Sequence, residues 1–339
     1  MSEARRRIAV LRGGMSLEHE VSLRSGTGVV DALRGKGHEA MPITIGKDGL
    51  WDFGDAAPLP FSDAVSRLAA LQPDCVFVAL HGGPGEDGRM QGLLDLMGLP
   101  YTTSGSLGSA LGMDKIRAKA IVAAAGVRVA RQVDFDATAW AKNRNGLVAR
   151  VRSEIGSPCV IKAPCQGSSC GMMINSDDAT LEADIDCIMA VEGRILAEEY
   201  VRGTEVTCAV LDVEPGITPR ALPLTEICPR NSAFFDYNEK YAADGAEEIT
   251  PARVSEEIAR LVGEMAVLAH QVIGCAVWSR SDFMVGPHGP VWIEVNTVPG
   301  LTETSLFPKA AAEVGIGYAD LMELFVESAI RASRTRQSR

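Results

Sequence analysis

The sequence predicts a multidomain α/β protein, from its length and from the order of its apolar segments. Its 339 residues exceed the size of one ordinary domain, and two or three domains of about 100 to 150 residues are expected. Near the N-terminus, short apolar runs alternate with helical stretches, which is typical of a parallel α/β domain. A second α/β unit follows in the C-terminal half. A chain organised in this way can hold a ligand in a cleft between domains.

Three buried strands and two helices are predicted in the N-terminal part of the chain. The strands are residues 8–11, 40–45 and 75–80. A helix is expected over residues 18–34, with Ser16 near its N-cap, and a second helix over residues 90–97. The small polar residues 102–106 mark a domain boundary.

The rest of the chain predicts further helices, strands and loops. In order, these are a helical segment at 106–126, a polar loop at 143–146, a strand at 158–162, a tight loop at 166–171, strands at 194–200 and 205–213, and a final amphipathic helix from 318 to about 332.

Composition and charge exclude several classes of function. The net charge of −11 and the pI near 5.1 argue against binding to nucleic acid or anionic membranes, because phosphate groups are bound through clustered Lys and Arg. No apolar run is long enough to cross a membrane, and the arginine-rich start lacks the apolar stretch of a signal peptide. The eight cysteines are scattered without a C-x-x-C pair, which favours reduced thiols in the cytoplasm over a zinc site or disulfides.

Residues 278–296 predict a β-hairpin that gathers polar side chains on one face. Two alternating runs are separated by a Gly/Pro turn. If the turn is centred on His288, two pairs face each other across the hairpin, Asp282 with Glu294 and Arg280 with Asn296. Residues two apart in a strand share a face, so all four side chains are expected to point the same way.

This set of side chains suits a magnesium site. Two carboxylates and an amide supply hard oxygen ligands, the kind that holds Mg²⁺ against substrate phosphates. The arginine beside them can bind a carboxylate or a developing oxyanion. A solvated face with a cross-strand ion pair is the alternative for any one of these charges, and the four together favour the metal.

Seven segments of the chain resemble, in order and spacing, the signatures of the D-alanine:D-alanine ligases. They are residues 13–22 (GGMSLEHEVS), 80–88 (LHGGPGEDG), 113–115 (MDK), 162–169 (KAPCQGSS), 235–241 (FDYNEKY), 280–282 (RSD) and 294–300 (EVNTVPG) with Ser305 and Leu306. The resemblance extends from about residue 7 to about residue 330.

The resemblance implies an ATP-grasp fold in three domains. These are an N-terminal Rossmann-like domain at 1–105, a central ATP-grasp subdomain at 106–200 and a C-terminal ATP-grasp α/β domain at 201–332, followed by a basic tail at 333–339. Such ligases bind ATP and Mg²⁺, usually two ions and with Mn²⁺ as a substitute, and usually form homodimers. The implied reaction is peptidoglycan precursor synthesis: one D-alanine is activated as an acyl phosphate and attacked by the amine of a second.

The resemblance also assigns ATP and metal binding to individual residues. Lysines would neutralise the phosphates during transfer, and a Gly/Ser loop would wrap them with backbone N–H groups. Glutamates would bind the adenine amino group and the ribose hydroxyls. The ATP-binding set is Lys115, Lys162, Gly167, Ser169, Glu198, Glu205 and Lys240, and the Mg²⁺ ligands are Asp282, Glu294 and Asn296.

The amino-acid substrates are assigned in the same way. Glu18 would bind the ammonium of the first D-alanine, and Arg280 with the backbone N–H of Gly300 would form the oxyanion hole. Residues 229–251 would form a lid that excludes water. The catalytic set is Glu18, Ser168, Tyr241, Arg280 and Gly300, and the substrate-binding set is Val21, His81, Ser305 and Leu306.

Several of these residues allow a simpler interpretation. Glu18 also fits an acid that complements a helix dipole, and His81 a structural, hydrogen-bonded histidine. Ala163 stands where the family usually has proline, Cys165 and Cys170 flank the phosphate loop, and residues 276–278 also differ from the family pattern. These departures concern nucleotide affinity and substrate detail more than reaction class.

Three competing functions remain open at this stage. A ligase of the same fold could make D-alanyl-D-lactate, D-alanyl-D-serine or another dipeptide, although the Lys240-Tyr241 pair resembles that of the D-alanine-using enzymes. A nucleotide-binding regulator without catalytic activity would not need an oxyanion hole. A nicotinamide-dependent dehydrogenase would carry G-x-G-x-x-G after the first strand, and Gly13-Gly14 is too weak a match.

Overall fold

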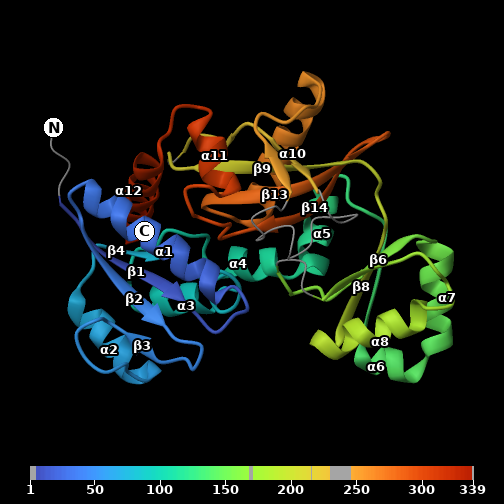
Figure 1. The fold of residues 1–339 in the computed structure, drawn as a ribbon, viewed down its shortest axis with the longest axis horizontal. Coiled ribbons are helices and arrows are strands. Elements are labelled where there is room, and N and C mark those ends of the chain that lie inside the picture. Colours follow the sequence, from blue (N-terminus) through green and yellow to red (C-terminus); the bar gives the residue numbers. More distant parts are fainter. Residues whose placement is uncertain (1–4, 168–170, 215, 230–245, 338–339) are drawn as a thin grey trace.

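The computed structural model describes residues 5–167, 171–214, 216–229 and 246–337. Within these ranges the chain forms three separate sheets, which Figure 1 shows as an N-terminal lobe (blue), a central lobe (green) and a C-terminal lobe (orange). No helix in the same ranges is both long and apolar enough to span a membrane.

The N-terminal sheet has the strand order β3-β2-β1-β4, in which β1, β2 and β4 are parallel. Its elements are β1 (Arg7–Gly13), α1 (His19–Gly35), β2 (Glu39–Ile45), β3 (Trp51–Asp52), α2 (Phe61–Leu71), β4 (Cys75–Val78) and α3 (Arg89–Leu96). The predicted strands and both predicted helices are confirmed. The sequence interpretation misses α2, because only Ala64 and Leu68 of this helix are buried and its apolar face is narrow.

Ser16 lies near the N-cap of α1, as predicted, two residues before it. Glu18 is the N-cap residue of α1. The Ser16 hydroxyl donates to the backbone carbonyl of His81 at 2.6 Å and accepts from the backbone N–H of Glu18 at 3.2 Å. Ser16 therefore ties the start of α1 to the loop after β4, which brings Glu18 and His81 into one region.

The central sheet has the order β5-β8-β6-β7, and all its strand pairs are antiparallel. The elements of this region are α4 (Ser106–Met113), α5 (Lys115–Ala124), β5 (Gln132–Asp136), α6 (Ala137–Lys142), α7 (Arg144–Glu154), β6 (Cys159–Lys162), β7 (Met172–Asn175), α8 (Leu181–Glu192) and β8 (Arg194–Glu199). The predicted strands at 158–162 and 194–200 are confirmed. Their apolar side chains pack in a core whose buried residues all come from the sequence range 133–197.

Two predictions in the central region need correction. Residues 106–126 form two helices, because Asp114 leaves the helical conformation and caps α5 by accepting from the N–H of Arg117. The predicted polar loop at 143–146 is wrong. Asn143 is the N-cap of α7 and accepts from the N–H of Gly146 at 3.1 Å, so these polar residues begin a helix.

The C-terminal sheet has the order β12-β11-β9-β13-β14, with β10 also paired to β9. Its region comprises β9 (Thr204–Asp212), β10 (Arg220–Ala221), β11 (Thr225–Cys228), β12 (Glu247–Ile249), α10 (Glu256–Ile273), β13 (Val277–Gly286), β14 (Gly289–Asn296), α11 (Leu306–Ala312) and α12 (Tyr318–Gln337). The strand predicted at 205–213 and the hairpin at 278–296 are confirmed. The final helix is longer than predicted, since α12 continues to Gln337.

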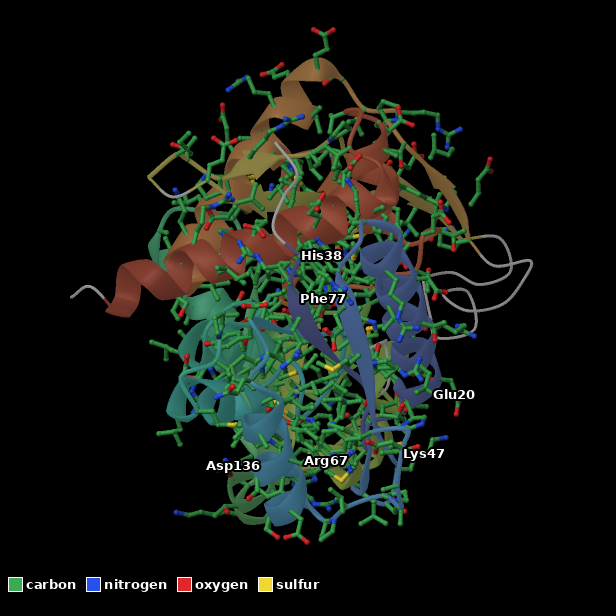
Figure 2. The ribbon with its side chains drawn as sticks, turned by 90° about the vertical axis from the view of Figure 1, so that its left-hand side faces the viewer. Glu20, His38, Lys47, Arg67, Phe77 and Asp136 are labelled. Atoms are coloured by element: carbon green, nitrogen blue, oxygen red, sulfur yellow. The ribbon has the colours of Figure 1, made fainter. Side chains whose placement is uncertain are left out.

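Helix α12 joins the C-terminal and N-terminal regions. It crosses above the N-terminal strands in Figure 2, where His38 and Phe77 lie beneath it. His38 Nε2 is 3.2 Å from Glu323 Oε1, and the Phe77 and Phe325 rings are 6.4 Å apart. Phe325 also stacks on Trp278 of β13 with ring centroids 4.9 Å apart. One apolar core therefore spans both regions.

Candidate active site

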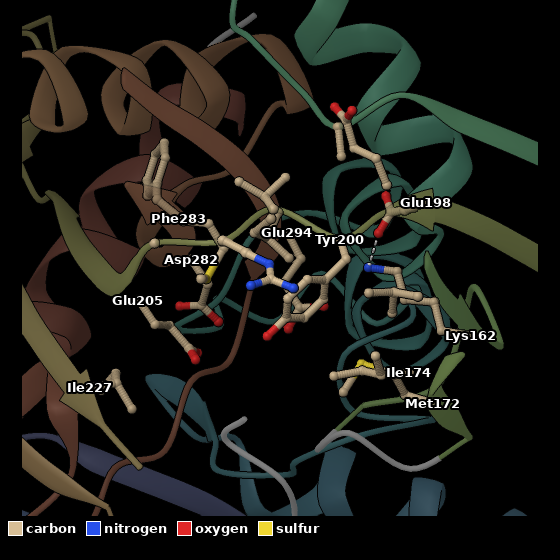
Figure 3. A pocket seen from close by; sticks show the side chains of 18 of the residues that line it. Lys162, Met172, Ile174, Glu198, Tyr200, Glu205, Ile227, Asp282, Phe283 and Glu294 are labelled. Atoms are coloured by element: carbon tan, nitrogen blue, oxygen red, sulfur yellow. Dashed lines mark ion pairs between the residues drawn. The ribbon is translucent and has the colours of Figure 1, made fainter. Parts of the chain in front are cut away.

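A cavity of about 390 Å³ lies between the central sheet and the C-terminal sheet. Side chains of β6, β7 and β8 line one wall, and side chains of β9, β11, β13 and β14 line the other. Figure 3 shows Lys162 and Glu198 on the first wall, opposite Asp282 and Glu205. Apolar residues, among them Ile174, lie beside these charges. The cavity can therefore hold a ligand with an apolar ring at one part and an anionic group at another.

Glu198 lies between two lysines on the central wall. Its Oε1 is 2.6 Å from the ammonium of Lys119, and its Oε2 is 2.5 Å from that of Lys162. All three side chains are buried. Burial alone would raise the pKa of Glu198, but the two lysines lower it, so the carboxylate is charged. The predicted phosphate ligand Lys162 and the predicted adenine ligand Glu198 thus form one cluster.

The predicted facing pairs of the hairpin are present, although the turn differs from the expected one. Arg280 pairs with Asn296 and Asp282 with Glu294. Gly286 pairs with Gly289, so the turn is not centred on His288. One extra residue, between the partners of Asp282 and Phe283, bulges out of β14 and restores the predicted register at the charged positions.

Each of the two facing carboxylates contacts a cation. Asp282 accepts from Nε and Nη2 of Arg280, both at 2.9 Å, and from the Asn296 amide at 3.2 Å. Glu294 Oε2 lies 3.1 Å from the ammonium of Lys115, at the start of α5. Burial would lower the pKa of Lys115, but Glu294 raises it above its usual value. Lys115, Asp282 and Glu294 therefore line the cavity together, and Arg280 and Asn296 join this group through their hydrogen bonds to Asp282.

The oxygen donors at this place fit Mg²⁺. The carboxylates of Asp282 and Glu294 face each other across the hairpin, and Asn296 follows on the same face. Hard oxygen ligands from two carboxylates, with room for phosphate oxygens beside them, are the usual protein contribution to a magnesium site.

Glu18 of the N-terminal region lies close to the predicted phosphate loop. A Cβ atom added to Gly82 would lie 3.1 Å from Glu18 Oε2, and one added to Gly167 would lie 3.5 Å from the same oxygen. The Glu18 carboxylate is therefore close to both the loop after β4 and the predicted phosphate loop. Val21 is buried in α1 nearly one turn after Glu18.

His81 is hydrogen-bonded through both ring nitrogens. Nδ1 is 2.9 Å from the carbonyl of Val298, and Nε2 is 2.9 Å from the Ser25 hydroxyl. Burial lowers the pKa of His81, so the ring is neutral, with Nδ1–H donating to the carbonyl. This is the structural role that the sequence left open, and it places His81 against the loop that carries Gly300.

That loop holds the other predicted substrate residues. Ser305 is the N-cap residue of α11, and its hydroxyl accepts from the N–H of Thr302 at 3.0 Å. Leu306 is the first residue of α11. A Cβ on Gly300 would lie 3.1 Å from the Ser305 hydroxyl oxygen, so a larger residue at position 300 would require Ser305 to shift. Gly300, Ser305 and Leu306 thus form one short segment.

The remaining predicted residues cannot be placed in the same way. Glu205 lines the cavity from β9. Gly167 ends the described part of the phosphate loop, and most of the predicted lid lies outside the described residues. Four predicted site residues also lie outside them: Ser168, Ser169, Lys240 and Tyr241. Their roles stay predictions.

Sequence reasoning missed two buried charged residues in this region. Lys119 follows Lys115 by one helical turn, and this spacing was the available signal. Glu86 is buried, and burial together with the negative charge of Glu18 raises its pKa well above the usual range. The positive charges of Arg280 and Lys115 lower the pKa of Glu86 in part. Charged groups from the N-terminal, central and C-terminal regions therefore surround Glu86.

The fold and the cleft together define an ATP-grasp enzyme: two antiparallel sheets enclose a cavity with lysines on one wall and a carboxylate-bearing hairpin on the other. Residues 7–104 match the family model for the D-ala D-ala ligase N-terminus, and residues 121–327 match that for the D-ala D-ala ligase C-terminus. The chain belongs to the D-alanine–D-alanine ligase family, as its sequence signatures predicted.

Individual relatives agree with this assignment. A D-alanine–D-alanine ligase of Halalkalibacterium halodurans is 41% identical over 327 residues, which cover 96% of this chain and 99% of the relative. That of Desulforudis audaxviator is 40% identical, over 96% and 98% of the two chains. Among solved structures, the VanG D-Ala:D-Ser ligase of Enterococcus faecalis superposes with a TM-score of 0.83 at 30% identity, covering 96% of this chain and all of that one. The D-alanine–D-alanine ligase of Bacillus anthracis superposes with a TM-score of 0.79 at 29% identity, covering 98% of this chain and 99% of that one.

Proposed function

We propose that the protein joins two D-alanine molecules into D-alanyl-D-alanine, with cleavage of ATP to ADP and phosphate, for peptidoglycan precursor synthesis in the cytoplasm. The observation that carries the proposal is the pairing of Lys115 with Glu294 and of Arg280 with Asp282, where Lys115 and the two facing carboxylates line the cavity. A carboxylate can approach a triphosphate only where cations neutralise both, and this part of the cavity supplies them.

In the first step, a carboxylate oxygen of one D-alanine attacks the γ-phosphorus of ATP, and the bond to ADP breaks. Glu18 binds the ammonium of this D-alanine, which orients its carboxylate toward the phosphate. Lys115 and Lys162 bind phosphate oxygens. Asp282, Glu294 and Asn296 would hold Mg²⁺, which neutralises further phosphate charge when bound.

In the second step, the neutral amine of another D-alanine attacks the acyl carbon. The tetrahedral oxyanion is stabilised by Arg280 and the backbone N–H of Gly300. As the carbonyl re-forms, the bond from the acyl carbon to the phosphate oxygen breaks, and the departing phosphate takes the proton that the amine nitrogen loses. Ser305 and Leu306 contact the second D-alanine, while Ser168 and Tyr241 hydrogen-bond with Glu18 and the lid excludes water. Glu205 and Glu198 bind the ribose and adenine, with Lys240, Gly167 and Ser169 beside the phosphates. We also propose that the protein forms a homodimer, and that its domain boundaries lie near residues 105 and 200.

D-serine is the competing second substrate, because the chain also superposes on the VanG D-Ala:D-Ser ligase. The test is incubation with ATP, Mg²⁺ and D-alanine, alone or with equal D-serine or D-lactate, followed by mass spectrometry of the products. D-alanyl-D-alanine should form in amounts equal to ADP and should dominate in every mixture. A dominant mixed product would overturn the substrate, and ADP release that does not depend on any amino acid would overturn the ligase.

A further inference from the structure

Behind the central wall of the cavity lies a lysine that a ligand cannot reach. Lys119 of α5 has 0% exposed surface, and its ammonium is 2.6 Å from Oε1 of Glu198. On another side its ammonium lies 5.8 Å from the ring centroid of Trp292. Glu198 and Lys162 line the cavity, whereas Lys119 is not among its lining residues. Of the residues that line the cavity, Glu198 is the one whose carboxylate pairs with Lys119, so we take Glu198 as the main route by which Lys119 acts on a ligand.

The cluster contains one more positive charge than negative charge. Lys162 contacts the second oxygen of Glu198 at 2.5 Å, so two ammonium groups share one carboxylate. A buried ion is tolerated only when it is paired, and Lys119 has its carboxylate partner within the cluster. The surplus charge therefore belongs to Lys162, the lysine that borders the cavity.

We propose that Lys119 is a positioning residue: by neutralising Glu198 it allows Lys162 to leave that carboxylate and bind a phosphate of the nucleotide. The inference rests on the proposed function, because it takes ATP as the ligand of the cavity. Without Lys119, Lys162 would be the counterion of a buried carboxylate, and its transfer to a phosphate would leave Glu198 unpaired. Glu198 and the nucleotide would then compete for one lysine.

The test compares a triphosphate with adenosine, which has no phosphate. Both are measured by displacement of a fluorescent ATP analogue, with the non-hydrolysable analogue AMP-PNP and Mg²⁺ as the triphosphate. Lys119→Met, which keeps the length of the side chain, should weaken AMP-PNP binding at least about tenfold and adenosine binding less than about twofold. Lys142→Met, on the exposed surface of α6, is the control for the lost charge and should bind both ligands like the wild type.

A second comparison isolates the route through Glu198. Once Glu198→Gln has removed the carboxylate, adding Lys119→Met should change AMP-PNP binding by less than about twofold. Lys119→Gln repeats the test with a polar, uncharged group and replaces Lys119→Met if circular dichroism shows that the latter is unfolded. Equal weakening of both ligands, wild-type binding of AMP-PNP, or a full effect in the Glu198→Gln background would each overturn the inference. A wild-type protein that binds no ATP would instead overturn the proposed function.

Discussion

Replacement of Glu294 by glutamine tests the hairpin end of the site most directly. The change removes one charge and almost no volume. In the structure it breaks the 3.1 Å pair with Lys115, while Lys115 keeps its hydrogen bond to the carbonyl of Gln166 at 2.8 Å. At this separation and an effective dielectric constant of about 20, the attraction is about 5 kcal/mol before desolvation is subtracted.

The cost to folding should be much smaller than this attraction. Both side chains retain some contact with solvent, at 11% and 19% exposure, and removal of Glu294 also removes its own desolvation cost. A loss of about 1 to 2 kcal/mol in unfolding free energy is expected. The effect on the reaction should be larger. We expect kcat to fall about 100-fold to 1,000-fold, because the metal that neutralises the phosphates would lose one of its two facing carboxylate ligands.

The assay is ADP release with D-alanine and Mg²⁺, with thermal unfolding measured on the same samples. Glu264→Gln is the matched control, since this exposed glutamate pairs with Arg260 on the surface of α10. It should keep wild-type activity. If Glu294→Gln retains more than about a tenth of wild-type activity, less than about 1.4 kcal/mol of transition-state stabilisation is lost and the assignment of Glu294 fails.

Three further predictions concern the core, the ion pair between Arg253 and the buried Glu226, and the nucleophile. Phe325→Ala should lower the unfolding free energy by about 3 to 5 kcal/mol, because the ring is fully buried against Trp278 and Phe77; a loss under about 1 kcal/mol in urea titration would contradict the shared core. Arg253 lowers the pKa of Glu226 to about 2, so the pair should stabilise the fold above the ordinary pKa of 4.5 and lose this contribution as the pH falls toward 2. Glu226→Gln should therefore flatten the acid side of the stability curve, and an unchanged curve would refute the pair's role. Since the attacking amine must be neutral, dipeptide formation should rise from about pH 6 to pH 9, and D-alanyl-D-lactate should be scarce at about pH 6. Competition between D-alanine and D-lactate at both pH values checks this, and predominant ester would overturn the amine assignment.

The hairpin was predictable because it depends on local rules. Alternation in a strand places Arg280 with Asp282, and Glu294 with Asn296, whatever the rest of the chain does. The bulge was not predictable, because the sequence does not mark which residue of β14 leaves the ladder. The facing pairs were correct because the displaced turn and the bulge offset each other.

Lys119 was not predictable from local rules. A lysine in a helix is usually solvated, and its burial depends on Glu198, which belongs to β8 and approaches only in the folded chain. The predicted loop at 143–146 failed for a different reason. Asn and Gly favour turns, but Asn is also a strong N-cap, and the helix that follows decides between the two.

Two separate apolar cores support different parts of the site. His81 contacts the carbonyl of Val298, Ser25 accepts from the N–H of Leu301 at 3.4 Å, and Tyr318 donates to the carbonyl of Leu301 at 2.7 Å. These contacts fix the loop with Gly300 to the N-terminal region and to α12, and the shared core around α12 supports both the loop and that region. The central wall with Lys162 and Glu198 packs on a separate core. The central wall therefore depends on packing that the Gly300 loop does not share, and substitutions in the core beneath the central wall should raise KM for ATP more than KM for D-alanine.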